Sequence, residues 1–288
     1  MTPQTESRTL DPDAIGRTLN VMGIDTFFHD AGEGPPLLLL HGSGPGVSAW
    51  SNWRPIYAAL AENHRVIAPD QVGFNRTQPD GPVSYGRKLW TDHALALLDE
   101  LGIEQCSVIG NSMGGAVALS LAAARPELID RVVAMGTMGI NGPIPDGLAE
   151  VWGYDPSPEA MRRLVELFAY DQSIVTDELV QMRYEASAEP TVRDAFAAMF
   201  PEPRQNGVDD LALSDAELRA LDKPILLVHG YNDRIVPFAA TSLPLMDVLP
   251  DVQLHAIGHA GHWVMIEQPQ AFTTSVLAFL HERERDLG

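Results

Sequence analysis

The sequence predicts an α/β fold in which helices cover both faces of a mostly parallel central sheet. Short apolar segments alternate with segments of helical periodicity along most of the 288 residues, as in folds built from strand–helix–strand units. The segment 37–41 is almost wholly apolar, which is typical of a strand buried on both faces. The alternation stops over 140–208, where proline-rich joints and helical patterns predict a helical lid over the carboxyl edge of the sheet.

The same patterns divide the chain into three parts. We expect a flexible tail at residues 1–18, an α/β core at 19–139 and 209–288, and the helical lid at 140–208. In the first half of the core, apolar runs predict strands at 21–29, 37–41, 65–69, 106–109 and 131–135. Helical spacing predicts helices between them at 50–62, 85–101 and 116–124. Gly102 suits the end of the second helix, because glycine adopts the left-handed backbone found there.

The second half of the chain is predicted in the same way. Helices are expected in the lid near 159–169, 176–188 and 191–199. The core then resumes with a strand at 225–229, a helix after Pro237, a strand at 252–257 and an amphipathic helix at 268–283.

Composition excludes several classes of function. The net charge of −20 argues against a nucleic-acid or anionic-membrane partner. Cys106 is the single cysteine, so there is no internal disulfide, and its place in a predicted strand indicates an inert buried thiol. Residues 1–17 lack the apolar stretch of a signal peptide, and no run reaches the roughly 18 apolar residues of a membrane span. We expect a cytoplasmic protein.

Residues 110–114 carry the first sign of catalysis. Their pattern, Gly-x-Ser-x-Gly, joins an apolar run to a small-residue helical run. A sharp strand-to-helix turn would place Ser112 on an exposed corner, as a nucleophile elbow does, and the flanking glycines avoid collisions there. The Met113 amide at the helix start would face a developing oxyanion. The alternative is an ordinary helix-capping serine in a glycine-rich turn.

A second glycine-rich loop, His-Gly-Ser-Gly-Pro-Gly at 41–46, follows the strand 37–41. It does not match a dinucleotide fingerprint, because the glycine spacing differs and Pro45 interrupts it. Beside a nucleophile elbow, this loop would supply the other oxyanion N–H. We expect that donor to be Ser43, with Gly42 permitting the close approach.

A base and an acid follow the last two core strands. Asp233 comes after the strand 225–229, and His262 comes after the strand 252–257. The chain order serine, aspartate, histidine at strand ends is that of the α/β-hydrolase fold. His262 would take the Ser112 proton, while Asp233 would fix the imidazole tautomer and stabilise the imidazolium.

Other histidines compete for the role of base. His255 and His259 are the rivals, whereas His41 and His229 precede glycines and are expected to shape the pocket. A metal site formed by His255, His259 and His262 is a further alternative. It is disfavoured because the segment follows a strand and lacks both a His-Glu-x-x-His pattern and a complement of carboxylates. We expect no metal.

These motifs together resemble a known family. The loop at 41–46 followed by Trp-Ser-Asn at 50–52, the elbow at 110–115, Asp-Arg-Ile-Val-Pro at 233–237 and Gly-His-Trp at 261–263 resemble the meta-cleavage product hydrolases. These enzymes hydrolyse carbon–carbon bonds in bacterial degradation of aromatic compounds. The lid segments are similar to the branch that acts on monocyclic compounds; they begin at Val151, Phe168, Thr176 and Met182. The resemblance runs from about residue 20 to the C-terminus.

The resemblance implies a substrate and an activity. The substrate would be a 2-hydroxy-6-oxohexa-2,4-dienoate, such as 2-hydroxymuconic semialdehyde or a 6-alkyl analogue, cleaved by water between C5 and C6 after ketonisation. The products would be 2-hydroxypenta-2,4-dienoate and a carboxylic acid. No cofactor is implied, and the family suggests a homo-oligomer.

The resemblance also implies residue roles. Arg183 would bind the substrate carboxylate with Asn52 and Asn111 as polar partners, and Trp263 would pack beside them. Gly42 completes the set of substrate-binding residues. Bulk in the lid and at Ile140, Ile144, Ile235 and Val236 would select the group on C6, with small groups favoured over phenyl.

Other functions remain open from sequence. A carboxylesterase or lactonase would use the same triad and oxyanion hole but needs no arginine for a substrate carboxylate. A catalytically silent binding protein is disfavoured by the intact triad. Haloalkane dehalogenases and epoxide hydrolases carry aspartate at the elbow, where this chain has Ser112. The intact elbow favours an acyl-enzyme over direct attack by water on the C6 ketone.

Overall fold

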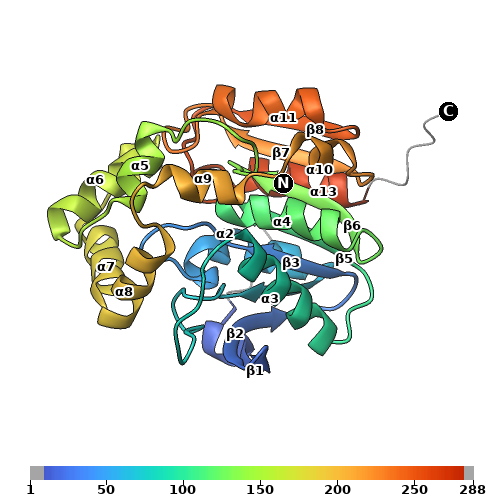
Figure 1. Cartoon of the computed structure of the whole chain (residues 1–288), viewed down its shortest axis with the longest axis horizontal. Helices are drawn as coiled ribbons and strands as arrows, with labels where there is room; N and C mark the ends of the chain where they lie inside the picture. The colour runs from blue at the N-terminus through green and yellow to red at the C-terminus, as the bar shows by residue number, and fades with distance from the viewer. Residues whose placement is uncertain (1–9, 282–288) are drawn as a thin grey trace, which may run out of the picture.

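The computed structural model describes residues 10–281. Its centre is an eight-stranded sheet in the order β1-β2-β4-β3-β5-β6-β7-β8 (Figure 1). The strands are β1 (Gly16–Val21), β2 (Ile24–Ala31), β3 (Pro36–Leu40), β4 (Arg65–Pro69), β5 (Cys106–Asn111), β6 (Ile129–Met135), β7 (Ile225–Gly230) and β8 (Val252–Ile257). β1 and β2 pair antiparallel at one edge, and all pairs from β4 to β8 are parallel. The prediction of a mostly parallel sheet is confirmed.

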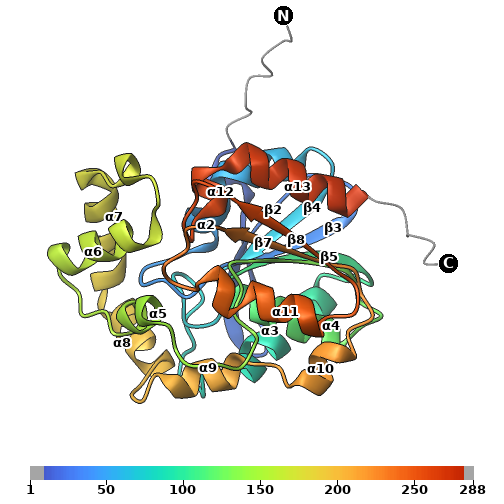
Figure 2. The same ribbon diagram turned by 90° about the horizontal axis from the view of Figure 1, so that it is seen from above.

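Helices form a layer on each face of this sheet. α2 (Ala49–Ala61), α12 (Val264–Glu267) and α13 (Pro269–His281) pack together on one face. On the other face lie α3 (Arg87–Glu100), α4 (Met113–Ala124), α10 (Asp215–Arg219) and α11 (Ser242–Val248), as Figure 2 shows. The central strands are therefore shielded from solvent on both sides, and residues 37–40 are fully buried. This burial explains why these strands have no polar alternation.

The N-terminal region differs from the prediction. A loose tail was expected to residue 18, but α1 (Pro12–Ile15) and β1 are ordered elements, while residues 1–9 lie outside the described residues. The single strand expected at 21–29 is instead a hairpin of β1 and β2. Its turn, Met22-Gly23, has φ values of 54° and 82°, which suit a two-residue hairpin. β1 forms because it pairs with the free edge of β2. Its own sequence is polar and lacks the apolar pattern that would predict a strand.

The remaining predicted core elements lie close to their predicted places. The strands agree within two residues at each end, and Gly102 has the expected left-handed backbone, with φ of 66°. The helix expected at 116–124 is α4, which begins earlier, at Met113. The helix expected at 268–283 is α13, and residues 282–283 lie outside the described part of the chain.

A helical insertion separates β6 from β7. It contains α5 (Asp146–Trp152), α6 (Pro158–Phe168), η1 (Gln172–Ile174), α7 (Asp177–Ala188), α8 (Pro190–Met199) and α9 (Gln205–Leu211). The three predicted lid helices are α6, α7 and α8, whereas α5 and α9 were not predicted. Figures 1 and 2 show α6, α7 and α8 beyond one end of the sheet. The Leu213 N–H donates to the Gly139 carbonyl at 3.0 Å, so the two ends of the insertion meet.

The helix α6 illustrates how the insertion forms. Ser157 caps its first turn by accepting from the Ala160 N–H, and Pro158 occupies the first turn, where proline needs no hydrogen bond. Its apolar residues recur at helical spacing and are buried: Met161, Leu164, Val165 and Phe168.

Within residues 10–281, no helix combines the length and apolar character needed to cross a membrane.

Candidate active site

Ser112 lies on a tight corner between β5 and α4. Its backbone has φ of 55° and ψ of −115°, a strained conformation for a residue with a side chain. A Cβ at Gly110 would come 2.1 Å from the Gly114 carbonyl oxygen, and one at Gly114 would come 2.3 Å from the Leu40 carbonyl oxygen. Both glycines are therefore required by close backbone packing, and the predicted strand–turn–helix corner is present.

Asp233 and His262 meet at the carboxyl ends of neighbouring strands. His262 Nδ1 lies 2.7 Å from Asp233 Oδ2, and the carboxylate acceptor assigns the proton to Nδ1. Asp233 Oδ1 accepts from the N–H groups of Ile235 at 2.8 Å and Val236 at 2.9 Å. Burial raises the pKa of Asp233, but attraction to His262 and the hydrogen bonds outweigh it, so the pKa lies below its ordinary range. The buried carboxylate is therefore held ionised.

His229 adds a contact that sequence reasoning missed. Its Nε2 lies 3.3 Å from Asp233 Oδ2 and 2.8 Å from the Val236 carbonyl oxygen. Its Nδ1 lies 2.7 Å from Ser242 Oγ. The ring is fully buried, so these contacts fix it behind the aspartate. The only sequence signal was the position of His229 at a strand end, and nothing there indicated Ser242 on α11.

Ser112 and His262 line the same narrow cavity, which lies between the elbow and the insertion. In the part of the chain that the structure describes, no hydrogen bond joins the Ser112 hydroxyl to the imidazole. Such bonds often tighten only when substrate binds.

The rivals His255 and His259 are exposed and do not line this cavity. Residues 10–281 also contain no cluster of three or more histidine, cysteine or acidic groups placed to hold a metal.

The loop at 41–46 passes directly over Ser112. A Cβ at Gly42 would lie 3.1 Å from Asn111 Oδ1 and 3.2 Å from Ser112 Cβ, which explains the glycine there. Ser43 is buried, and its Oγ accepts from the Trp152 indole N–H at 3.0 Å. A residue of the insertion therefore holds this loop in place.

His41 anchors the start of the same loop. Its Nε2 accepts from the Gln71 N–H at 3.0 Å, and the Gln71 side-chain amide donates to the His41 carbonyl at 2.6 Å. Its Nδ1 donates to the Gly42 carbonyl at 2.7 Å. Burial lowers the pKa of His41 to about 4, so the ring is neutral at pH 7, as its acceptor role requires.

The other end of the cavity contains polar groups without protein partners. Arg183 is only 8% exposed, and its guanidinium lies 4.7 Å from the centre of the Trp263 ring. No acidic side chain pairs with it among the described residues, and its Nε and the Asn52 Nδ2 are buried without a hydrogen bond. Asn111, also at this cavity, donates from Nδ2 to the Met135 carbonyl at 3.3 Å. Burial, and then nearby Arg54, lower the pKa of Arg183 to about 10, so it stays charged at neutral pH. A buried unpaired cation favours a bound anion.

The insertion is also joined to the histidine loop. The Phe168 carbonyl accepts from the His262 N–H at 2.9 Å, and the Phe168 ring stacks on Trp263 with centroids 4.8 Å apart. Glu267 accepts from the Gly261 N–H at 2.7 Å with one oxygen and from the Tyr170 N–H at 2.7 Å with the other. No motif around Glu267 indicated that it would link these two loops.

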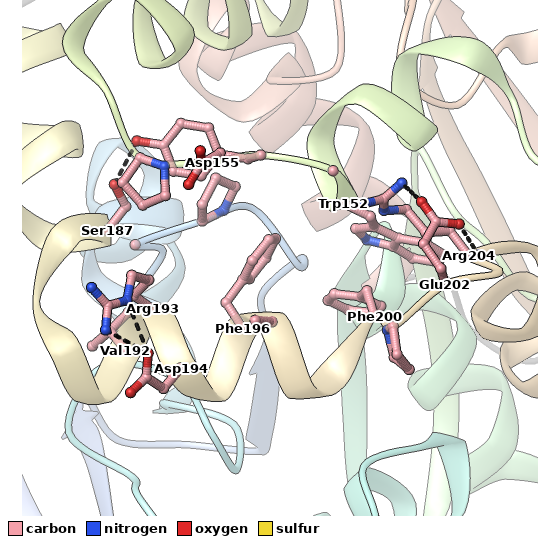
Figure 3. Close-up of a pocket in the computed structure, with 17 residues that line it drawn as sticks. Trp152, Asp155, Ser187, Val192, Arg193, Asp194, Phe196, Phe200, Glu202 and Arg204 are labelled. Atoms are coloured by element: carbon pink, nitrogen blue, oxygen red, sulfur yellow. Dashed lines mark hydrogen bonds and ion pairs between the residues drawn. The ribbon is translucent and has the colours of Figure 1, made fainter.

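A larger cavity of about 370 Å³ lies beside the insertion helices α5 and α8 (Figure 3). Aromatic rings of Trp152, Phe196 and Phe200 line it, and Trp152 stacks on Phe200 with centroids 4.2 Å apart. Neither Ser112 nor His262 lines this larger cavity. The candidate catalytic residues therefore belong to the smaller one, and Trp152 both lines the larger cavity and donates to Ser43.

Comparison with known proteins agrees with this geometry. Residues 35–269 match a family described as having the alpha/beta hydrolase fold. The chain is also 48% identical to 2-hydroxymuconate semialdehyde hydrolase of Pseudomonas sp. strain CF600, over 94% of this chain and 95% of that protein. This chain belongs to the meta-cleavage product hydrolases of the α/β-hydrolase family.

Two further similarities are consistent with this assignment. Among the meta-cleavage product hydrolases, the chain is 46% identical to 2-hydroxy-6-oxo-2,4-heptadienoate hydrolase of Pseudomonas putida strain F1, over 92% of this chain and 96% of that one. The crystal structure of the meta-cleavage product hydrolase CumD from Pseudomonas fluorescens IP01, a mutant complexed with acetates, superposes with a TM-score of 0.90. That similarity has 45% identity and covers 92% of this chain and 97% of CumD.

Proposed function

We propose that this enzyme hydrolyses the C5–C6 bond of 2-hydroxy-6-oxohexa-2,4-dienoates, with 2-hydroxymuconic semialdehyde and its 6-alkyl analogues as substrates. The products are 2-hydroxypenta-2,4-dienoate and a carboxylic acid. The observation that carries this proposal is a buried, unpaired Arg183 in the same cavity as Ser112 and His262. An ordinary esterase gains nothing from that arginine, whereas a dienoate brings the anion that it lacks.

The arginine end binds and prepares the substrate. Arg183 holds the carboxylate with a bidentate pair of hydrogen bonds, and Asn52 donates its free N–H to the adjacent 2-oxygen. A proton then moves to C5, which converts the dienol to its keto tautomer. This tautomer can accept the electron pair that the C5–C6 bond releases, so carbon becomes a feasible leaving group.

The triad end breaks the bond. Ser112 Oγ attacks the C6 carbonyl while His262 takes its proton, and the oxyanion lies at the N–H groups of Ser43 and Met113. The C5–C6 electron pair forms the C4–C5 double bond and moves through C3 to the 2-oxygen, which takes up the proton from the imidazolium; this regenerates the dienol and leaves His262 neutral. Water, activated by His262, then hydrolyses the acyl ester on Ser112 and releases the carboxylic acid.

The cavity favours a small group on C6. Of the four residues expected near that group, Ile235 lines the catalytic cavity, together with Leu148 and Val151 from the insertion. Ile140, Ile144 and Val236 are not among its lining residues. These branched apolar side chains restrict the space beside Ser112, which supports hydrogen or short alkyl groups over phenyl.

A spectrophotometric assay tests the proposal. The yellow ring-cleavage products of catechol, 3-methylcatechol and 2,3-dihydroxybiphenyl are mixed with enzyme, and visible absorbance is followed. We expect fast bleaching of the first two and slow bleaching of the third, with none by Ser112→Ala. Hydrolysis of simple esters without bleaching of any dienoate would support the alternative, a carboxylesterase or lactonase.

The separate lid domain at 140–208, the homo-oligomeric state and the cytoplasmic location stay part of the proposal. The meeting of the insertion ends at Gly139 and Leu213 supports a lid that extends slightly further, to residue 212.

A further inference from the structure

A second cavity shares its wall with the catalytic cavity. It has a volume of about 260 Å³ and lies where α2, the η1–α7 segment and α12 approach one another. Arg183 and Trp263 line both this cavity and the catalytic one. Arg54, on α2, lines only the second cavity, which we call the Arg54 cavity.

The Arg54 cavity carries only positive charge. Its lining residues include two arginines and no acidic side chain, although the chain has a net charge of −20. Among residues 10–281, neither the Arg54 nor the Arg183 guanidinium makes a hydrogen bond or an ion pair with the protein. Arg54 is exposed while Arg183 is buried. Burial lowers the pKa of Arg183, and repulsion from the nearby Arg54 guanidinium lowers it further.

This combination fits an amphipathic carboxylate. An anion placed near both guanidinium groups would relieve their repulsion and satisfy the buried Arg183. The rest of the wall is largely apolar and includes Ile174, Leu179 and Ile266, which suits a hydrocarbon chain attached to the carboxylate.

We propose that the Arg54 cavity is an outer carboxylate-binding site, where the dienoate is captured before it enters the catalytic cavity. This inference rests on the proposed function. Because Arg183 lines both cavities, the carboxylate can exchange between them without leaving its main cation. An acidic protein repels an anionic substrate at long range, so a local pair of cations has a large effect on its capture.

A binding experiment tests the site separately from catalysis. Ser112 is first labelled with an aryl phosphonate, which fills the catalytic cavity, and benzoate is then titrated by calorimetry. The labelled wild-type protein is expected to bind one benzoate, and Arg54→Gln should weaken this binding by roughly tenfold, with partial rescue by Arg54→Lys. Lys88→Gln is the matched control, since it removes an exposed cation on α3 at the opposite face of the sheet.

Two results would overturn the outer site: labelled wild-type protein that binds no benzoate, or equal binding by Arg54→Gln. Neither binding result depends on which bond the enzyme cleaves. A failure of the proposed function would instead appear in the bleaching assay, so the two failures can be distinguished.

Kinetics test the capture role. At low salt, Arg54→Gln should lower kcat/KM for the dienoate roughly three- to tenfold with a much smaller change in kcat, and the difference should shrink in 0.5 M salt, a concentration at which the Debye length is only about 4 Å. The loss on a neutral ester should be several times smaller. A kcat/KM for the dienoate equal to that of Lys88→Gln at low salt would contradict the capture role.

Discussion

The two ends of the catalytic cavity differ in how their polar groups are satisfied. At the triad end, both oxygens of Asp233 accept hydrogen bonds, and His229 has partners on both ring nitrogens. At the arginine end, the Arg183 Nε and the Asn52 Nδ2 are buried with no partner. The network behind His262 is therefore satisfied by the protein itself, whereas these donors at the arginine end are not.

This difference separates two physical tasks. A network whose members are all satisfied holds its geometry without substrate, which is what proton transfer requires. Unsatisfied buried donors instead lower the stability of the free protein, and a bound anion restores this stability by accepting their hydrogen bonds. Changes at the triad end should therefore affect the chemical step, and changes at the arginine end should affect substrate binding and selectivity.

The largest expected effect is at the triad end. Asp233→Asn should lower kcat on the dienoate by about 10⁴-fold, because an amide can no longer hold His262 in the tautomer that accepts the Ser112 proton. Binding, measured from the spectrum of the bound yellow substrate, should change little. Asp80→Asn, at an exposed position, is the control. A loss in kcat below tenfold would be incompatible with the role of Asp233.

At the arginine end, a substitution should affect substrate binding and selectivity more than the chemical step. Arg183→Met should lower kcat/KM on dienoates by about 10²- to 10³-fold, because two charge-assisted hydrogen bonds are lost, with a much smaller loss on neutral esters. The unfolding free energy should rise, by about 1 kcal/mol or more, because a buried unpaired charge is removed. Urea unfolding measures this, with exposed Arg163→Met as control. Equal losses on both substrate types would remove the carboxylate role.

A pH titration tests whether the loop at 41–46 depends on a neutral His41. The folded pKa of His41 is lowered to about 4 by burial, whereas an unfolded histidine has a pKa near 6.5. Between these values the unfolded chain binds more protons, so the unfolding free energy falls as the pH drops from about 6.5 to 4. The fall due to His41 is about 3 kcal/mol at most.

Urea unfolding at several pH values in this window measures the slope. His41→Gln should flatten it, whereas His255→Gln, at an exposed position, should not. An unchanged slope in His41→Gln would show that protonation of this ring is not coupled to unfolding.

The smallest expected effect is at the contact between the insertion and the triad end. Trp152→Phe removes the indole donor to Ser43 but keeps an aromatic ring against Phe200. We expect kcat to fall about two- to fivefold, corresponding to one neutral hydrogen bond. Trp90→Phe is a close control, since Trp90 also donates an indole hydrogen bond, to the Val72 carbonyl at 3.0 Å, outside the site. Equal losses of kcat in both variants would indicate a general effect on stability.

Some features could be predicted from sequence because local rules determine them. The buried strands lack polar residues, the elbow needs its two glycines, and the triad members follow strand ends in a recognisable order. Errors arose where tertiary pairing decides, as at β1, which was expected to be tail because its sequence is polar and its partner strand is what orders it.

The sequence by itself predicted the α/β fold and a serine, an aspartate and a histidine at strand ends, because these depend on residue type and spacing along the chain, whereas Arg183 as the cation for a carboxylate followed from the family resemblance. Only the tertiary structure decided how these groups are supported. His229 and Ser242 behind the aspartate, Trp152 on Ser43, and Glu267 between two loops join residues far apart in sequence. Their contacts exist only once packing brings distant elements together, so no local pattern could encode them. Among the described residues, the same packing left Arg183 against the Trp263 ring but without an acidic partner, between two cavities.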